Sequence, residues 1–210
     1  MSLLGNEPRD LLIVAAAELC TERGYEEITP LGIAERAGLP VDVMSHQFPG
    51  GTEECLVDAE NAILLEVVTA VSHSYSADRS EWESVIHGVK AILELMAANP
   101  EFAYLGYVFS RQMAPGQVKE VNEAGHRMLE GMLERGWEYS GSVHQPAFAA
   151  LGVLGGAQAI VRQEIVRGRA AELPGILPDC VYIATVPFLG QREALRLTQQ
   201  ARALVGQGPF

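Results

Sequence analysis

Three neighbouring side chains could read the edges of DNA bases: Ser45, His46 and Gln47. All three carry hydrogen-bonding groups, and the amide of glutamine can bond to adenine through both of its polar atoms. They lie at the end of a short predicted helix that begins at Pro40. This combination points to contacts with bases in a DNA groove.

The segment that would position these side chains is 29–48, which has the pattern of a helix-turn-helix. Thr29 can cap a first short helix that starts with Pro30, and Gly38 supplies the turn. The second short helix begins at Pro40 and is expected to make apolar contacts through Val43, Met44 and Phe48. The second helix of such a motif can enter a DNA major groove.

The rest of the chain shows helical periodicity and no convincing strand, so we expect an all-α fold. Outside the helix-turn-helix, apolar spacing and Gly/Pro breaks predict helices at 8–23, 52–73, 80–98, 102–113, 118–137, 146–167, 178–189 and 191–205. Thr52 is expected to cap the long helix that follows it.

The charge balance argues against a general affinity for nucleic acid or anionic membranes. The chain of 210 residues has 15 basic and 27 acidic side chains, which gives a net formal charge of −12. Residues 1–60 alone hold three basic and twelve acidic side chains. Because non-specific DNA affinity comes mainly from neutralised phosphates, we expect weak binding to random DNA.

Catalytic and metal-binding patterns are weak. The pairs Glu83/His87 and His126/Glu130 each share a helix face, but two ligands do not make a metal site. The sequence has no nucleophile elbow, no phosphate-binding loop and no dinucleotide fingerprint. We therefore expect no enzymatic activity, no metal and no cofactor.

The cysteines and the apolar segments indicate the cellular location of the protein. The three cysteines are scattered and are interpreted as buried or free thiols: Cys20, Cys55 and Cys180. The most apolar segments fall short of the roughly 20 residues needed to span a bilayer, and the first residues lack a secretion signal. We expect a soluble cytoplasmic protein with no membrane partner.

Three stretches resemble the TetR family of one-component transcriptional regulators. The family's first helix resembles RDLLIVAAAELCTERGY at 9–25, its second helix and turn resemble ITPLGIAERAGL at 28–39, and the step into its fourth helix resembles HQFPGGTEECL at 46–56. The match covers residues 9–60. It implies a helix-turn-helix DNA-binding domain over residues 1–50, followed by a C-terminal helical domain for effector binding and dimerisation over residues 51–210.

In that family the second helix of the motif lies in the major groove, and flanking residues hold phosphates. By position, the resemblance assigns DNA contacts to Pro40, Val41, Asp42, Met44, Ser45, His46 and Gln47, with Thr29 and Thr52 near the DNA backbone. The sequence departs from the family pattern where Ser45 replaces the usual tyrosine and Thr52 replaces the usual lysine. Val41, next to Asp42, occupies a position where many members carry a polar or basic group.

Aromatic and methionine side chains gather between residues 82 and 139 and could line a pocket for a small apolar or amphipathic effector. The candidates are Trp82, Phe102, Tyr104, Tyr107, Met113, Met128 and Met132. Side chains at this helical spacing could equally belong to the hydrophobic core and contact no ligand.

Two apolar helices near the C-terminus could pair with a second copy of the chain. Gly152 and Gly156 are four residues apart, so two helix backbones could approach closely there, and the helix at 178–189 is apolar nearly all round. Because the family dimerises through its last long helices, we expect a homodimer. The expected interface residues are Leu151, Gly152, Leu154, Gly155, Gln158, Val181, Tyr182 and Thr185.

These features predict a TetR-like transcriptional regulator, a repressor that binds operator DNA as a dimer and is released by a small-molecule effector. The alternative is a helical dimeric ligand-binding or protein-interaction module that has lost DNA binding. The helix, turn and glycine spacing favour the regulator, whereas the acidic charge, Ser45 and Thr52 favour the alternative.

Overall fold

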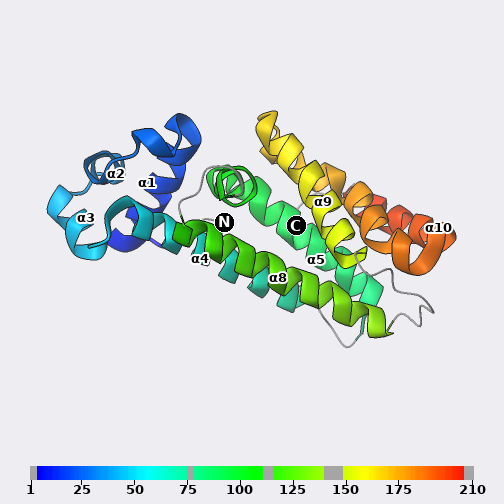
Figure 1. Cartoon of the computed structure of the whole chain (residues 1–210). Coiled ribbons are helices and arrows are strands. Elements are labelled where there is room, and N and C mark those ends of the chain that lie inside the picture. Colours follow the sequence, from blue (N-terminus) through cyan, green and yellow to red (C-terminus); the bar gives the residue numbers. More distant parts are fainter. Residues whose placement is uncertain (1–3, 75–77, 111–115, 140–148, 206–210) are drawn as a thin grey trace. The chain divides into compact units, whose positions relative to one another are not determined.

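The computed structural model describes residues 4–74, 78–110, 116–139 and 149–205, and every regular element within them is a helix (Figure 1). The predicted all-α fold class is confirmed. In chain order the elements are α1 (Pro8–Arg23), η1 (Tyr25–Glu27), α2 (Pro30–Ala37), α3 (Val41–Gln47), α4 (Gly51–Ser74), α5 (Glu81–Ala98), α6 (Pro100–Tyr104), η2 (Leu105–Phe109), α8 (Gly116–Tyr139), α9 (Ala149–Val166), η3 (Ala170–Ile176) and α10 (Leu177–Val205).

The chain divides into two compact units, each built from two separate stretches. The first unit comprises Met1–Glu66 and Ala98–Gly125, and the second comprises Val67–Ala97 and His126–Phe210. This division differs from the predicted one at residue 50. Residues 51–66 of α4 belong with α1–α3, and α6 packs on α1, so both stretches join the first unit.

The helix-turn-helix forms through the local signals that the sequence carries. Thr29 has an extended backbone, and its Oγ accepts a hydrogen bond from the Gly32 N–H at 3.1 Å. Pro30 occupies the first turn of α2, where the missing N–H costs nothing. Gly38 ends α2 with φ of 68°, a left-handed conformation that only glycine adopts without a steric penalty.

Apolar side chains from five helices and η2 form the core of the first unit. The largest buried ones are Leu12, Ile33, Met44, Phe48, Leu56, Phe102 and Phe109. Full burial of such a side chain stabilises a fold by about 1.5–3 kcal/mol. Since helices as short as α2 and α3 are unstable alone, this packing holds them in place. Tyr25 adds to the core, with its ring 5.8 Å from that of Phe109.

The second unit contains α5, α9 and α10. A capping box starts α5, in which the Ser80 N–H donates to Glu83 Oε2 at 2.9 Å and the Glu83 N–H donates to Ser80 Oγ at 3.3 Å. Trp82 packs against a buried cluster from α9 and α10 that consists of Ala150, Val153, Ala184 and Phe188. The rings of Trp82 and Phe188 meet edge to face, 5.5 Å apart.

Two details differ from the predicted helices. The helix predicted at 102–113 is a short α6 followed by the π-helical η2, because the Ser110 N–H bonds to the Leu105 carbonyl five residues back. Glu54, rather than Thr52, caps α4 by accepting the Gly50 N–H at 2.7 Å. The predicted break near residue 190 is confirmed: Gly190 has non-helical backbone angles (φ of 74°, ψ of 169°), so α10 consists of two helices that meet at a kink there. Residues 111–113 and 146–148 of the predicted helices lie outside the described residues.

One helical stretch is more apolar than the sequence analysis expects. Within Ala170–Val205, an 18-residue window has a mean hydropathy of 1.4, which by length and composition is sufficient to cross a membrane. Helices in the core of a soluble protein can reach the same length and mean hydropathy. In this stretch Ala184 and Phe188 pack against α9, which accounts for their apolar character.

Candidate nucleic-acid interface and helical effector unit

Helix α3 exposes its polar side chains and buries one apolar side chain. Asp42, Ser45 and His46 are exposed, and Val41 is 46% exposed. Met44 is 0% exposed. Its assignment as a DNA contact is therefore wrong, because Met44 is the side chain that packs α3 into the core.

The other predicted DNA contacts flank α3. Pro40 is exposed at the start of the helix, and Gln47 is half-buried at its end. Thr29 is exposed, and because its Oγ accepts the Gly32 N–H, the hydroxyl proton can still be donated to a phosphate. Thr52 is half-buried in the first turn of α4.

Arg9 ties the end of α3 to α1 and α4, a role that the sequence analysis missed. Its Nε and Nη2 donate to Asp58 Oδ2 at 3.0 and 2.5 Å, and its Nη1 donates to the Gln47 carbonyl at 2.5 Å. The guanidinium carbon lies 4.2 Å from the centre of the Phe48 ring, in a cation–π geometry. These contacts direct the Arg9 side chain into the unit instead of toward a phosphate.

Arg36 is also paired inside the first unit. Its Nη1 donates to Glu18 at 3.1 Å and to Glu22 at 2.8 Å, and its Nη2 donates to the second oxygen of Glu22 at 2.5 Å. The hydrogen bonds from Arg36 hold the pKa of Glu22 below its ordinary value, and they raise the pKa of Arg36. The pair is therefore charged at neutral pH.

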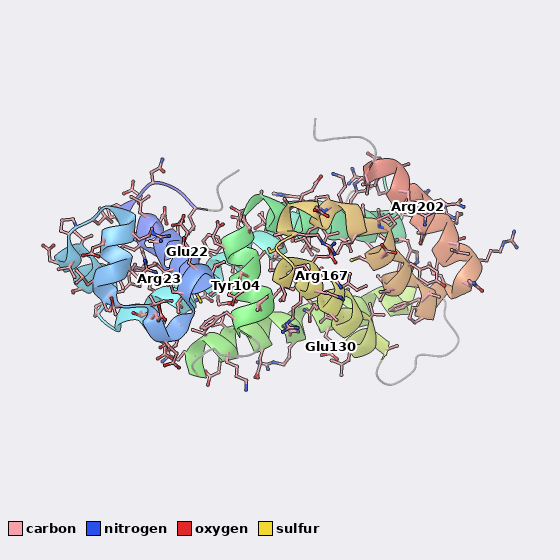
Figure 2. All side chains as sticks on the ribbon, turned by 90° about the horizontal axis from the view of Figure 1, so that it is seen from above. Glu22, Arg23, Tyr104, Glu130, Arg167 and Arg202 are labelled. Atoms are coloured by element: carbon pink, nitrogen blue, oxygen red, sulfur yellow. The ribbon has the colours of Figure 1, made fainter. Side chains whose placement is uncertain are left out.

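These ion pairs leave the surface around α3 with very little positive charge. Within residues 4–60, Arg23 is the one arginine or lysine outside an ion pair, and it lies exposed at the end of α1 beside Glu22 (Figure 2). Residues 1–60 contain twelve acidic side chains. Because DNA-binding surfaces gain most of their affinity by neutralising phosphates, a DNA contact here would depend on the hydrogen-bonding groups of α3.

The candidate effector residues fall in both units. Trp82 belongs to the second unit, where it is half-buried against Phe188. Phe102 is fully buried in the core of the first unit, and Tyr104 and Tyr107 are half-buried there. Met113 and the side chains of Met128 and Met132 lie outside the described residues.

The candidate dimer residues separate into an outward and an inward set. Leu151 is 51% exposed, Gly152 is exposed, and Leu154, Gly155 and Tyr182 are partly exposed. The other three, Gln158, Val181 and Thr185, are buried within one copy of the chain. Their assignment to an interface between copies is therefore wrong: Gln158 Oε1 lies 2.5 Å from His126 Nε2, and Thr185 Oγ1 donates to the Val181 carbonyl at 2.7 Å.

The cysteines have the character of structural thiols. All three are buried, and burial raises the pKa of Cys20, Cys55 and Cys180 to about 12. Such thiols stay protonated at neutral pH and react slowly. Across the described segments, no group of three or more His, Cys, Asp or Glu side chains could hold a metal ion.

No protein-family model matches the chain, and no curated protein matches its sequence. Its fold, in contrast, matches solved structures along almost the whole chain. The fatty acid degradation regulator FadR from Bacillus halodurans is 19% identical, with a TM-score of 0.73 over 89% of this chain and 97% of its own. A TetR-like transcriptional regulator from Rhodococcus sp. RHA1 is 17% identical, with a TM-score of 0.73 over 90% of this chain and 100% of its own. A gamma-butyrolactone receptor (ArpA like protein) is 17% identical, with a TM-score of 0.71 over 94% of this chain and 98% of its own.

The architecture is that of an all-α protein with an N-terminal helix-turn-helix. More narrowly, it is the fold of TetR-type transcriptional regulators, which the resemblance over residues 9–60 implies from the sequence. At these identities the likeness establishes the fold, and the function has to be argued from the residues of this chain.

Proposed function

We propose that this protein is a one-component transcriptional regulator, a repressor that binds operator DNA as a homodimer and leaves it when a small molecule binds. The observation that carries the proposal is the geometry of α3, in which Met44 is buried while Asp42, Ser45 and His46 project outward. A helix held in this way can lie in a major groove. We propose a cytoplasmic location and no catalytic role.

Within this proposal, Ser45, His46 and Gln47 read bases, and the hydroxyl groups of Thr29 and Thr52 contact phosphates. Sequence-specific hydrogen bonds would supply most of the affinity. If Arg23 neutralises one phosphate per protomer, a dimer neutralises about two, and the logarithm of affinity falls with the logarithm of salt concentration with a slope of about −2. A typical repressor shows a much steeper dependence.

We propose that the exposed face of α9 forms the dimer interface. Along this face lie Leu151, Gly152, Gly155, Ala159, Gln163 and Val166, of which Leu151 and Val166 are exposed apolar side chains. A Cβ added at Gly152 or Gly155 would meet nothing within 4 Å, so another helix could approach the backbone there. Small residues between two apolar side chains suit close packing of two helices.

The effector is proposed to be a small apolar or amphipathic molecule. Two solved structures of the same fold are described as a gamma-butyrolactone receptor and as FadR from Bacillus subtilis in complex with stearoyl-CoA, the latter 16% identical with a TM-score of 0.66. In the first unit of this chain, Tyr104 and Tyr107 are half-buried aromatic side chains that could contact such a ligand.

The proposed mechanism is a population shift. Two α3 helices of a dimer must match half-sites about 34–36 Å apart, one turn of DNA. An effector that binds more tightly to dimers with a different spacing draws the population away from the DNA-binding form. The effector need not touch α3.

A second candidate function has its own observation. Arg9 and Arg36 form ion pairs within the first unit, and residues 1–60 carry many more acidic than basic side chains. These pairs favour a dimeric ligand-binding or protein-interaction module that keeps the helix-turn-helix as a scaffold without binding DNA.

The deciding experiment is fluorescence anisotropy with the DNA flanking the protein's own gene, at about 30 and 150 mM salt, against a scrambled duplex. The regulator predicts saturable binding that prefers the flanking DNA and has a shallow salt slope. His46→Ala should weaken this binding, whereas Gln191→Ala, on the exposed surface of α10, should not. If the flanking DNA binds no better than the scrambled duplex at the lower salt concentration, the second candidate function replaces the first.

A further inference from the structure

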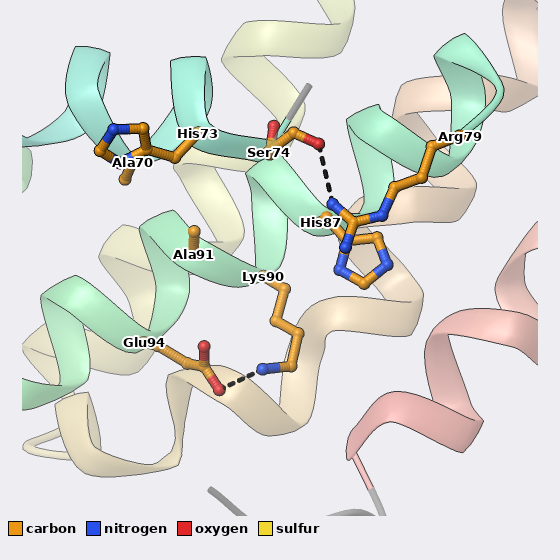
Figure 3. Close-up of a pocket in the computed structure, with 8 residues that line it drawn as sticks. All are labelled: Ala70, His73, Ser74, Arg79, His87, Lys90, Ala91 and Glu94. Carbon is orange, nitrogen blue, oxygen red and sulfur yellow. Dashed lines mark hydrogen bonds and ion pairs between the residues drawn. The ribbon is translucent and has the colours of Figure 1, made fainter. Parts of the chain in front are cut away.

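A groove in the second unit is lined by an unusual concentration of basic side chains. It lies between the end of α4 and residues 87–94 of α5 and has a volume of about 230 Å³ (Figure 3). Its lining includes His73, Arg79, His87 and Lys90, with Glu94 as the one carboxylate. We refer to it as the basic groove.

The basic groove stands out against the rest of the chain. The protein has 15 basic and 27 acidic side chains, and Lys90 is one of only two lysines, the other being Lys119. With the histidines counted as neutral, Arg79 and Lys90 outweigh Glu94 by one positive charge, and a concave surface with an excess of one sign of charge attracts a counter-ion. The composition of the groove therefore suits an anion.

The walls of the groove are fixed by contacts on each side. The Arg79 Nη1 donates to the Ser74 carbonyl at 3.1 Å, and Ser74 Oγ donates to the Val71 carbonyl at 2.6 Å. Gly88 allows α5 to approach α4, because a Cβ at this position would lie 3.0 Å from Ser74 Oγ. A preformed site of this kind loses little entropy when a ligand binds.

The donors are arranged around the groove. Figure 3 shows the Arg79 guanidinium beside the His87 ring, and the Lys90 ammonium directed to Glu94, from which it lies 2.5 Å away. Lysine has three N–H donors and arginine five, so both keep donors for a ligand. A phosphate group offers three strong acceptor oxygens, one more than a carboxylate, to donors that come from more than one side chain.

The electrostatics of His87 agree with an anion site. Burial lowers the pKa of His87, and the charges of Arg79 and Lys90 lower it further, against a smaller opposing effect of Glu83. The lowered pKa favours the neutral form of the ring. A bound anion would favour the protonated ring, which would then add one more charged donor.

We propose that the basic groove binds a phosphate group, either as free inorganic phosphate or as the phosphate of a larger small molecule. At about 230 Å³ the groove is smaller than the roughly 300–1,000 Å³ typical of pockets that enclose a whole drug-sized ligand. It therefore holds one polar group of a ligand. This site is separate from the proposed contacts with DNA and does not depend on them.

The test adds sodium phosphate or glycerol phosphate to the full chain, with sodium chloride of the same ionic strength as the control. Calorimetry measures binding, and thermal unfolding measures stabilisation. Both phosphates should bind and raise the unfolding temperature more than chloride does. Tighter binding of glycerol phosphate would assign the site to a phosphate carried by a larger molecule, and tighter binding of inorganic phosphate would assign it to the free ion.

Variants make the test specific to the groove. Arg79→Gln and Lys90→Gln should each weaken phosphate binding by about tenfold or more, as expected for a lost hydrogen bond between charged groups. Lys119→Gln, which removes the other lysine from an exposed position on α8, should have no effect. Glu94→Gln should tighten binding, because it removes the competing carboxylate.

Nuclear magnetic resonance of the histidine rings supplies an independent readout. Phosphate should raise the pKa of His87, and Lys90→Gln should need a higher phosphate concentration than the parent for the same rise. Two results would overturn the proposal. One is a response to phosphate no larger than that to chloride. The other is an equal loss of binding in Lys119→Gln and Lys90→Gln. Neither result would bear on whether the protein binds DNA.

Discussion

The Arg9 Nη1 donates to the main-chain oxygen of Gln47 at 2.5 Å, so a side chain at the start of α1 caps the last turn of α3. Carbonyl groups at the end of a helix have no partner within it and carry partial negative charge. The same guanidinium bonds to Asp58 on α4. The orientation of α3, the helix proposed to read DNA bases, is therefore set by an ion pair between α1 and α4.

We expect Arg9→Ala to lower the free energy of unfolding by about 1–2 kcal/mol. The Arg9 and Asp58 side chains are 39% and 30% exposed, so solvent screening keeps the loss at this level. The stability of Arg9→Lys should lie between that of the parent and that of Arg9→Ala, because an ammonium group cannot form the bidentate hydrogen bonds of a planar guanidinium. Urea unfolding measures the loss, with exposed Arg23→Ala as the control. Equal stability of Arg9→Ala and Arg23→Ala would contradict this role.

The Glu22–Arg36 pair should make stability depend on pH. Hydrogen bonds from Arg36 lower the pKa of Glu22 from 4.5 in the folded chain. The stabilisation is therefore fully present above the unfolded pKa and is lost as the pH falls through the folded one. Arg36→Gln should reduce the urea midpoint at pH of about 7, and the difference from the parent should shrink below a pH of about 4.5. Exposed Arg202→Gln is the control, and a pH-independent difference would rule out this account.

Glu60 is a buried carboxyl group whose partner is known. It is 4% exposed on α4, and the hydroxyl of Ser110, itself 2% exposed, hydrogen-bonds to it. Glu60→Ala removes this hydrogen bond and should cost about 1–2 kcal/mol, because the Ser110 hydroxyl keeps the Leu105 carbonyl as an acceptor at 2.8 Å. Glu60→Gln keeps the size of the side chain and the hydrogen bond, so it should cost much less. Thermal unfolding of the two variants compares them, and an equal loss would show that the hydrogen bond is not what stabilises this site.

The glycines of α9 allow the proposed dimer interface to be tested. In a single copy of the chain, alanine at Gly152 or Gly155 should stabilise α9 by up to about 1 kcal/mol, because it improves helix propensity and meets no atom. In a dimer packed through this face, the added Cβ separates the two helices. We expect both variants to dissociate at higher protein concentration than the parent, as measured by analytical ultracentrifugation.

Gly156 provides the matched control for that test. A Cβ at Gly156 would meet Ile183 Cγ2 at 3.5 Å, an ordinary contact within the same chain. Gly156→Ala should therefore leave the dimer intact. If all three alanine variants dimerise like the parent, the interface lies elsewhere.

Local signals were sufficient to predict most helices of this chain. Proline in the first turn and glycine after the last turn delimit α1, whose predicted bounds match Pro8–Arg23. Thr29 and Gly38 act as predicted at the two ends of α2. Each of these signals involves residues a few positions apart, so the sequence contains the whole interaction.

The site residues that were missed depend on contacts between distant segments. Arg9 and Asp58 are 49 positions apart, and no periodicity relates them. The basic groove likewise joins the end of α4, the link to α5 and α5 itself. Burial was misjudged for the same reason: Met44 and Gln158 lie on helices whose inward faces are set by tertiary packing.

Stability and recognition should be separable on α3 by comparing Met44 with His46, which are two residues apart. Met44 is fully buried, so Met44→Ala should cost about 2–5 kcal/mol of stability and weaken any DNA binding indirectly. His46 is exposed, so His46→Ala should change stability by less than about 0.5 kcal/mol. If His46 reads a base, its loss should still weaken operator binding by about 1–3 kcal/mol, which is five-fold to more than a hundred-fold. Thermal unfolding and fluorescence anisotropy on the same samples give both quantities. An unchanged DNA affinity in His46→Ala, Ser45→Ala and Gln47→Ala would mean that α3 does not read bases, whatever Met44→Ala does, because only the buried residue can act through folding.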